Sequence, residues 1–488
     1  MSYYVIGIGG TGARCIEAFV HLCAAGLMPQ GKLNLYFVDA DETNGNLVFA
    51  KDMISKYTGF LEGIHRSGSV LGSASLFQTE IHTHEVWSPF KRYQASVTLE
   101  DVFSYSSMDE DPQDLFELLY TNKKRKMKFQ NGFLGWPSVG SSVIAKEYKS
   151  FDELISKISH DNSAKVILIG SIFGGTGAAG IPTLAKLIKD SFHGGNRNTP
   201  NQGEGIKRTL GLILMLPYFN FQALEGEEDP NANPTNFKLK TKMALEYYHN
   251  QKLHDICDAI YTLSDDFTLK TSDSTVKGGQ EQKNNPHFLE LYAGLFALDF
   301  FINNERFQDN SYNKYFEAGR TLKEQIGWSD LPYPGGRDEL IDKLGRMIYF
   351  SFAYCTKFFP RIKQCFELDH AQASRTVGWY GEFFSKHPDN KAFFSDLRAY
   401  CLMFLKWLEV MQKSAKGQVD INLVRDNYLM PPDPKGFGNL LHDVKNTYSS
   451  VDAFENEFMK VRKRDFPDAQ GDVGKFINAL YKHSLKIN

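Results

Sequence analysis

The stretch "KVILIGSIFGGTGAAGIPTLAKLI", residues 165–188, decides the fold class of this chain. An apolar run rich in β-branched residues comes first, a turn of small residues follows, and an amphipathic pattern begins near Pro182. This order predicts a strand, a glycine loop and a helix. Such a loop is typical of a phosphate site, because bare backbone N–H groups and a helix N-terminus both favour an anion.

The glycine loop at residues 174–180 contains no lysine, whereas a P-loop requires one on the terminal phosphates. It does not fit the dinucleotide pattern G-x-G-x-x-G either. A second loop, "GIGGTGARC" at residues 7–15, follows the first predicted strand and does fit that pattern. In a dinucleotide-binding protein, Asp39 or Asp41 would then meet a ribose. A plain dinucleotide fold, however, has no place for the loop at 174–180.

Length, charge and cysteine content limit the classes of protein to which this chain can belong. With 488 residues, 42% hydrophobic and 23% charged, the chain is long enough for two or three globular domains. A net charge of -3 gives no bulk reason to expect nucleic acid or an anionic membrane as a partner. The six cysteines form no C-x-x-C pair, which predicts reduced core residues in a cytoplasmic protein. The longest apolar stretches are too short for a membrane span.

Two regions are predicted from the pattern of apolar residues. Residues 1–335 alternate apolar runs with amphipathic segments, which predicts an α/β domain with a mostly parallel sheet flanked by helices. It includes a long apolar helix expected from Pro286 to about Phe301, with Asn285 just before it. Residues 336–488 read as a mainly helical C-terminal domain, and the boundary is expected between Pro332 and Gly336.

Read together, "GIGGTGA" and "FGGTGAAG" resemble the two phosphate loops of the tubulin/FtsZ superfamily of GTPases. Divergent bacterial tubulin-like proteins are the closer comparison for "GIGGTGARCIEAFVHLCAAGL". The resemblance implies a tubulin/FtsZ-like domain that binds GTP or GDP through backbone amides, so that no lysine is needed. The residues implied around the β and γ phosphates are Gly174, Gly175, Thr176 and Gly177, and those around the α and β phosphates are Gly9, Gly10, Thr11 and Gly12.

The resemblance also implies contacts to the metal, the γ-phosphate, the ribose and the base. "VDADETN" is similar to the family's acidic loop, and "GFLGWPSVGSS" is similar to its third glycine loop. Asn285 is the candidate for guanine recognition, although the same residue also reads as a helix cap. The other residues implied are Asp39 and Asp41 for Mg²⁺ or its waters, Gly135 and Gly140 near the γ-phosphate, and Glu225 near the ribose.

In this family the hydrolytic acid lies in an N-x-D-x-x-[DE] loop at the far end of the central helix, where it completes the site of the next subunit. "NPHFLEL" imitates that spacing with Glu290 at the last position, but it lies where the central helix is expected to start. "WSDLPYPGGRDEL" follows that helix and offers Asp330 or Asp338. Chain order favours the second segment.

The resemblance therefore implies a GTP-binding protein whose GTP hydrolysis depends on head-to-tail self-assembly into filaments. The family's second domain is built on a β-sheet, whereas helices are predicted here. This departure leaves open a GTP-sensing scaffold that does not polymerise and that contacts protein partners through its C-terminal domain. A dinucleotide-dependent oxidoreductase, which depends on the first loop alone, is the third alternative.

Overall fold

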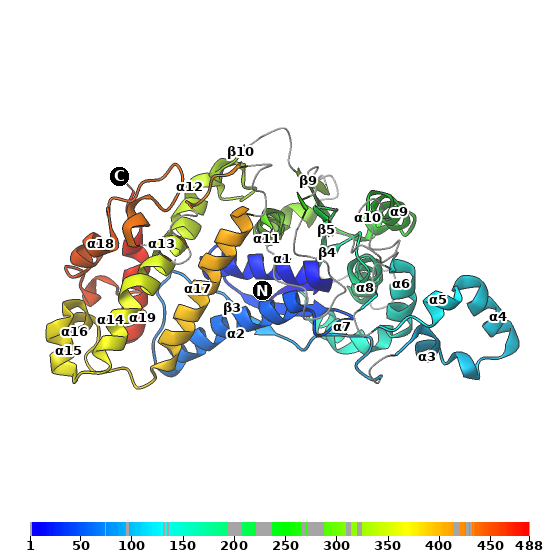
Figure 1. The fold of residues 1–488 in the computed structure, drawn as a ribbon, viewed down its shortest axis with the longest axis horizontal. Helices are drawn as coiled ribbons and strands as arrows, with labels where there is room; N and C mark the ends of the chain where they lie inside the picture. The colour runs from blue at the N-terminus through cyan, green and yellow to red at the C-terminus, as the bar shows by residue number, and fades with distance from the viewer. Residues whose placement is uncertain are drawn as a thin grey trace.

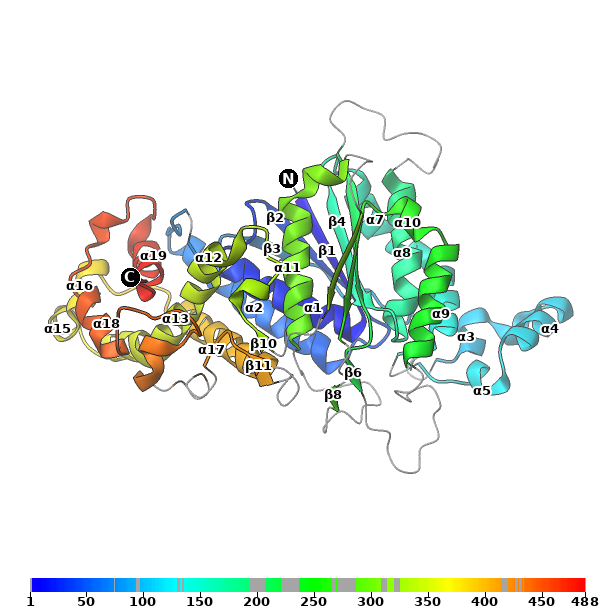
Figure 2. The same ribbon diagram turned by 90° about the horizontal axis from the view of Figure 1, so that it is seen from above.

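A parallel β-sheet forms the centre of the molecule, with helices on both faces and a helical C-terminal region at one end (Figures 1 and 2). The structure is a computed structural model of the chain. It describes residues 2–73, 75–93, 97–129, 132–133, 136–192, 207–220, 237–265, 269–270, 287–308, 314–319, 325–413, 420–425, 429, 432 and 434–487.

All neighbouring strands of the seven-stranded sheet are parallel, and their order is β3-β2-β1-β4-β5-β7-β9. The chain builds from β1 toward one edge and then, from β4, toward the other. The strand order therefore reverses between β1 and β4, and at such a point loops diverge and leave a crevice at the carboxyl edge. The strands are β1 (Ser2–Ile8), β2 (Lys32–Val38), β3 (Glu80–Thr83), β4 (Lys165–Ser171), β5 (Thr209–Met215), β7 (Ala259–Ser264) and β9 (Tyr315–Gly319).

Each face of the sheet has its own hydrophobic core, because successive side chains of a strand point to opposite faces. Val5 belongs to one core, and its neighbours Tyr4 and Ile6 belong to the other. The first face is covered by α1 (Gly9–Ala24), α2 (Gly45–Arg66) and α11 (Phe288–Ile302). The second is covered by α6 (Pro137–Lys146), α7 (Asp152–Ser159), α8 (Thr176–Phe192), α9 (Phe237–Asn250) and α10 (Leu253–Ile256).

The C-terminal helices, a helical projection and four two-residue strands complete the fold. The C-terminal region contains α12 (Gly336–Leu340), α13 (Arg346–Ala353), α14 (Phe359–Cys365), α15 (His370–Thr376), α16 (Gly378–Phe383), α17 (Ala392–Lys413), α18 (Val451–Phe458) and α19 (Gly471–Ser484). A projection between β3 and α6 carries α3 (Leu99–Phe103), α4 (Glu110–Leu119) and α5 (Asn122–Arg125). The two-residue strands are β6 (Phe219–Asn220), β8 (Leu269–Lys270), β10 (Gln325–Ile326) and β11 (Asp420–Ile421).

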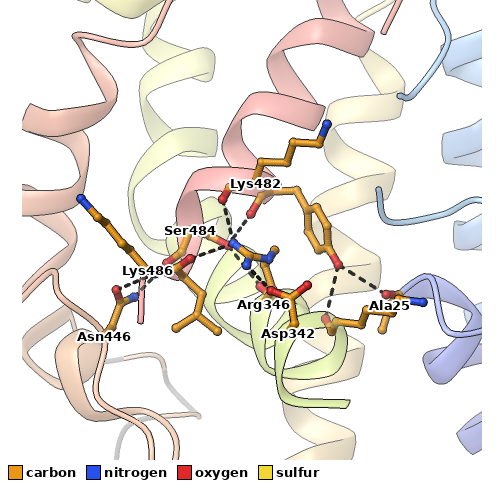
Figure 3. A network of polar contacts seen from close by, with 10 residues as sticks. Ala25, Asp342, Arg346, Asn446, Lys482, Ser484 and Lys486 are labelled. Atoms are coloured by element: carbon orange, nitrogen blue, oxygen red, sulfur yellow. Dashed lines mark hydrogen bonds and ion pairs between the residues drawn. The ribbon is translucent and has the colours of Figure 1, made fainter. Parts of the chain in front are cut away.

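The C-terminal region shares one continuous hydrophobic core with α1, α2 and α11. Inside this core, His21 Nδ1 of α1 lies 2.9 Å from the Tyr400 hydroxyl of α17. The Tyr481 hydroxyl of α19 donates to the Ala25 carbonyl, 3.4 Å away (Figure 3). The helices after residue 336 therefore pack directly on the α/β layer.

The last turn of α19 is tied to α13 by Arg346 (Figure 3). Its guanidinium donates to the Lys482 and Leu485 carbonyls at 2.7 Å each and pairs with Asp342. Asn446 donates to the Ser484 carbonyl at 2.9 Å. Helix C-termini leave carbonyls without intrahelical partners, so these donors stabilise the end of α19.

The predicted fold class is confirmed: a parallel sheet flanked by helices is followed by a mainly helical region. Three helix boundaries differ from the prediction. Helix α1 begins at Gly9 and helix α8 at Thr176, each inside a predicted glycine loop. Helix α11 begins at Phe288 and has His287 as its N-cap. In the part of the chain that the structure describes, no helix has the length and apolar character needed to cross a bilayer.

Substitution of two glycines of α2 by alanine is expected to change the free energy of unfolding in different ways. A Cβ on Gly63 would lie 2.4 Å from Phe393 Cβ of α17, whereas one on Gly59 would meet nothing closer than 3.5 Å. We expect Gly63→Ala to lower the free energy of unfolding by about 1–3 kcal/mol through overpacking. The matched control Gly59→Ala should be neutral or raise it by up to about 1 kcal/mol, since alanine favours a helix. Urea denaturation measures both, and equal effects would contradict the close α2–α17 contact.

Candidate functional site

The two glycine loops meet at the carboxyl edge of the sheet, where the strand order reverses between β1 and β4. One loop joins β1 to α1, and the other joins β4 to α8. A Cβ on Gly9 would lie 3.6 Å from both the Gly177 nitrogen and Thr176 Cβ. The two loops therefore lie about one methyl group apart, and both helices begin at the same edge.

In the first loop, glycines allow α1 to start directly against the sheet. Gly9 has φ +73°, a left-handed conformation that glycine adopts without strain. A Cβ on Gly12 would lie 2.7 Å from the Ile169 carbonyl oxygen of β4. Gly10 is half-buried and Thr11 is buried. The N-cap residue Ile8 makes no side-chain cap bond, so no N-cap side chain satisfies the first N–H groups of α1.

In the second loop, the backbone turns back onto the end of β4. A Cβ on Gly177 would lie 2.3 Å from the Ser171 carbonyl oxygen, so only glycine fits there. A Cβ on Gly174 would lie 2.8 Å from Ser171 Oγ. Gly174, Gly175 and Thr176 are half-buried and lie just before or at the start of α8. This arrangement presents accessible backbone at a second helix N-terminus.

Asp39, the first residue after β2, lies beside both loops. Its Oδ1 accepts a hydrogen bond from Thr176 Oγ1 at 3.4 Å and another from the Asp41 amide at 3.2 Å. Oδ2 accepts no hydrogen bond from any described residue, although the side chain is only 4% exposed. Burial raises the pKa of Asp39 to about 7, and the charge of Asp41 adds to this effect. A buried oxygen with no partner is a costly feature unless a ligand completes it.

Asp41 is also buried, and its Oδ1 accepts from the Thr43 amide at 3.0 Å and from the Thr43 hydroxyl at 2.8 Å. A Cβ on Gly132, in the third loop, would lie 3.7 Å from Asp41 Cβ. Carboxylate oxygens are the ligands that Mg²⁺ prefers, usually together with waters and substrate phosphates. Asp39 in particular fits this metal, because its buried Oδ2 is without a described partner beside two loops suited to phosphate.

Of the remaining residues predicted to contact the nucleotide, one lies in α6 and three lie outside the described residues. Gly140 is buried inside α6, where its Cβ would lie 2.8 Å from Ala179 Cβ of α8. Its observed contact is therefore helix packing. Gly135, Glu225 and Asn285 lie outside the described residues.

Glu290 is fully buried at the start of α11. Its Oε1 lies 2.6 Å from Arg14 Nε and accepts from the Tyr218 hydroxyl at 2.7 Å. Its Oε2 accepts from the His287 amide at 2.9 Å, which closes a capping box. Burial opposes the charge on Arg14, but Tyr218 and Glu290 raise its pKa overall. Glu290 thus ties α1 to α11 within its own molecule, and no part of it is exposed to a neighbouring one.

The segment with Asp330 and Asp338 was expected at the far end of the central helix, and the structure corrects this. Strand β9 runs parallel to β7, so it returns the chain to the carboxyl edge. The Asp330 carbonyl accepts from the Tyr292 hydroxyl, near the start of α11, at 3.0 Å. Asp330 Oδ2 accepts from the Gly327 amide at 2.9 Å. Asp338 on α12 is exposed and pairs with Arg337 at 3.0 Å.

The far end of α11 carries a different acid, Glu305, which the sequence analysis missed. The Asn304 side chain anchors this end to the amino edge of the sheet by donating to the Thr209 hydroxyl at 2.8 Å. Glu305 follows and is exposed. The sequence "NNERFQ", residues 303–308, contained the signal. It has Asn at the first position of N-x-D-x-x-[DE] and Glu, in place of Asp, at the third. This signal was hidden because the helix end could not be located from an apolar run alone.

Comparisons with known proteins give structural likeness only. No family model and no curated protein matches the sequence. The solved structures that match include CetZ2 from Haloferax volcanii, a GTPγS-bound protofilament, at 11% identity and a TM-score of 0.28; the alignment covers 62% of this chain and 59% of that one. CetZ1 from Haloferax volcanii, a GDP-bound monomer, aligns at 14% identity and a TM-score of 0.29, covering 62% and 61%.

CetZ from Methanosaeta thermophila strain DSM 6194 aligns at 12% identity and a TM-score of 0.27, covering 64% of this chain and 56% of that one. The alignments thus span less than two thirds of the length of each of these solved structures.

The raised pKa of Asp39 predicts a pH-dependent stability difference. Its pKa is about 7 in the folded state and about 3.9 when unfolded. The folded state therefore binds the proton more tightly, and this stabilisation is lost as pH rises through 7. We compare the two chains without nucleotide or Mg²⁺. The free energy of unfolding of Asp39→Asn, relative to that of the native chain, should rise by about 1.4 kcal/mol per pH unit between roughly pH 4 and pH 7. Urea unfolding at several pH values checks this, and a constant difference would contradict it.

Proposed function

We propose that this chain binds a guanine nucleotide with Mg²⁺ at the carboxyl edge between β1 and β4, and hydrolyses GTP. The observation that supports it most directly is the close approach of two glycine loops at adjacent helix N-termini, with the buried Asp39 beside them. Guanine as the base follows from the resemblance to the tubulin/FtsZ superfamily.

The site has the chemistry to hold phosphates without a lysine. Backbone amides and the N-terminal ends of α1 and α8 supply positive potential from two directions. Mg²⁺, when bound, neutralises charge on the phosphates, and Asp39 with Asp41 would hold it or its waters. Gly9, Gly10 and Thr11 would contact the inner phosphates, and Gly174, Gly175, Thr176 and Gly177 the outer ones.

Hydrolysis in this proposal requires a second copy of the chain. GTP hydrolysis needs a water that is positioned and polarised beside the γ-phosphate. The exposed Glu305 lies at the amino edge of the sheet, and the glycine loops lie at the carboxyl edge. Helix α11 has 15 residues and separates the two ends by about 22 Å. Head-to-tail stacking would bring Glu305 of one copy to the nucleotide of the next and, if its rotation does not close, would give an open filament.

The alternative is a GTP-sensing scaffold that binds nucleotide without polymerising. The continuous core between the C-terminal helices and α1 favours it, because α1 also forms the phosphate loop. Sedimentation with and without GTP separates the two functions: a scaffold keeps a small fixed mass, whereas a filament former gains mass steeply with concentration.

Replacing Gly175 with valine should abolish nucleotide binding. A branched side chain at this half-buried position would block the approach of a phosphate to the backbone amides. We expect the affinity for GTP, measured by calorimetry, to fall by at least about a hundredfold, which corresponds to about 2.7 kcal/mol. Gly59→Ala serves as a control that leaves binding unchanged. Unaltered affinity in Gly175→Val would refute the assignment of this loop.

Mixing two inactive variants should restore GTP hydrolysis. Glu305→Gln keeps the nucleotide site but loses the acid, and Gly175→Val keeps the acid but loses the nucleotide site. We expect each variant alone to release phosphate at least about tenfold more slowly than the native chain. An equimolar mixture should recover activity, because the acid of one chain completes the site of another.

Asp330→Asn and Asp338→Asn are the matched comparisons, since they remove the other candidate acids. Full activity in both, together with rescue in the mixture, assigns the role to Glu305. Loss of activity in Asp330→Asn with normal binding would assign the role to Asp330 instead. Absence of rescue would reject the shared site.

A further inference from the structure

Helix α4 lies at the tip of the projection (Figure 1), and its exposed residues include large apolar ones. Its one buried side chain, Phe116, packs against aromatic rings of the projection, with Tyr120 5.0 Å away between centroids. Leu115, Leu118 and Leu119 follow the i, i+3, i+4 spacing of one helix face and are exposed, Leu118 by 83%. Three exposed leucines on one face are unusual, and such a patch typically marks an interaction site.

Helix α9 lies on the same flank of the molecule (Figure 2) and carries a second stripe of exposed apolar residues. On its inner side, the Tyr248 hydroxyl donates to the Ala178 carbonyl of α8 at 2.9 Å. Leu239, Met243 and Tyr247 recur every fourth residue and are exposed, Met243 by 61%. The stripe therefore lies on the side of α9 that faces away from the sheet.

The two helices carry opposite charge. Helix α4 contains four acidic residues and no basic one. Among the described residues, none pairs with the side chains of Asp111 or Asp114, whereas Arg125 already neutralises Glu117 at 2.6 Å. Helix α9 contains three lysines and one glutamate, and Lys240 lies beside its apolar stripe. An acidic apolar helix and a basic apolar helix are complementary both in packing and in electrostatics.

We propose that these faces bind each other between two copies of this chain, α4 of one copy lying on α9 of the other. Because both helices lie on one flank, a two-fold axis allows both contacts to form at once and closes the assembly as a dimer. This flank is distinct from the two edges of the sheet used by the proposed head-to-tail contact. The dimer does not require nucleotide, so it can be tested whether or not the GTPase proposal holds.

Disulfide trapping tests the contact directly, because all six native cysteines are buried. Leu118→Cys protein and a size-tagged Met243→Cys protein are mixed and mildly oxidised. The expected product is a cross-linked pair of one tagged and one untagged chain. The control replaces Met243→Cys with Val48→Cys, which is 51% exposed on α2, on the other face of the sheet. Equal cross-linking in the control, or a predominance of Leu118→Cys homodimers, would overturn the proposal.

Sedimentation equilibrium without nucleotide gives an independent measure. Leu118→Lys should weaken the dimer about tenfold or more, and Val48→Lys should not. Asp111→Lys with Asp114→Lys should also weaken it, and adding Lys240→Glu with Lys242→Glu to the same chain should restore it. A native chain that stays monomeric, or a Leu118→Cys/Met243→Cys double variant that cross-links only within one chain, would reject the dimer.

Discussion

The close approach of α1 to the ends of β1 and β4 is the constraint on which the rest of the structure depends. A Cβ on Gly12 would meet the Ile169 carbonyl oxygen at 2.7 Å, and one on Gly177 would meet the Ser171 carbonyl oxygen at 2.3 Å. Because these positions admit no side chain, two helices can begin against two adjacent parallel strands. Their N-terminal amides then lie around one point, and Asp39 reaches the same point from β2.

Helix α11 connects this edge to the opposite one. It carries apolar residues on all sides, as expected for a helix buried between the sheet and another layer. At its start, the buried Arg14–Glu290 pair fixes it to α1, and at its end Asn304 fixes it to β5. Removing either member of a buried ion pair leaves an uncompensated charge, so this contact holds the register of the two helices strongly. The exposed Glu305 thereby has a defined position relative to the sheet.

The helical C-terminal region extends the core of the α1, α2 and α11 layer. Within that core, His21 Nδ1 pairs with the Tyr400 hydroxyl, and the Tyr481 hydroxyl donates to the Ala25 carbonyl. Since α1 contributes both to the first glycine loop and to this interface, the proposed nucleotide site and the C-terminal helices share this helix. The α4 projection and α9 lie on the other face of the sheet, away from the C-terminal helices.

The sequence by itself determined the α/β class, the parallel sheet, the helical C-terminal region and both glycine loops. These features depend on local periodicity and on glycine, whose signals are read within a few residues. Only the tertiary structure decided which segments meet. It showed that Glu290 is a buried partner of Arg14, that β9 returns Asp330 to the carboxyl edge, and that Glu305 lies at the far end of α11. The physical reason is that the sequence around an acidic residue beside an apolar helix is the same whether its side chain caps the helix, forms an ion pair or faces solvent. Only packing between distant segments distinguishes these roles.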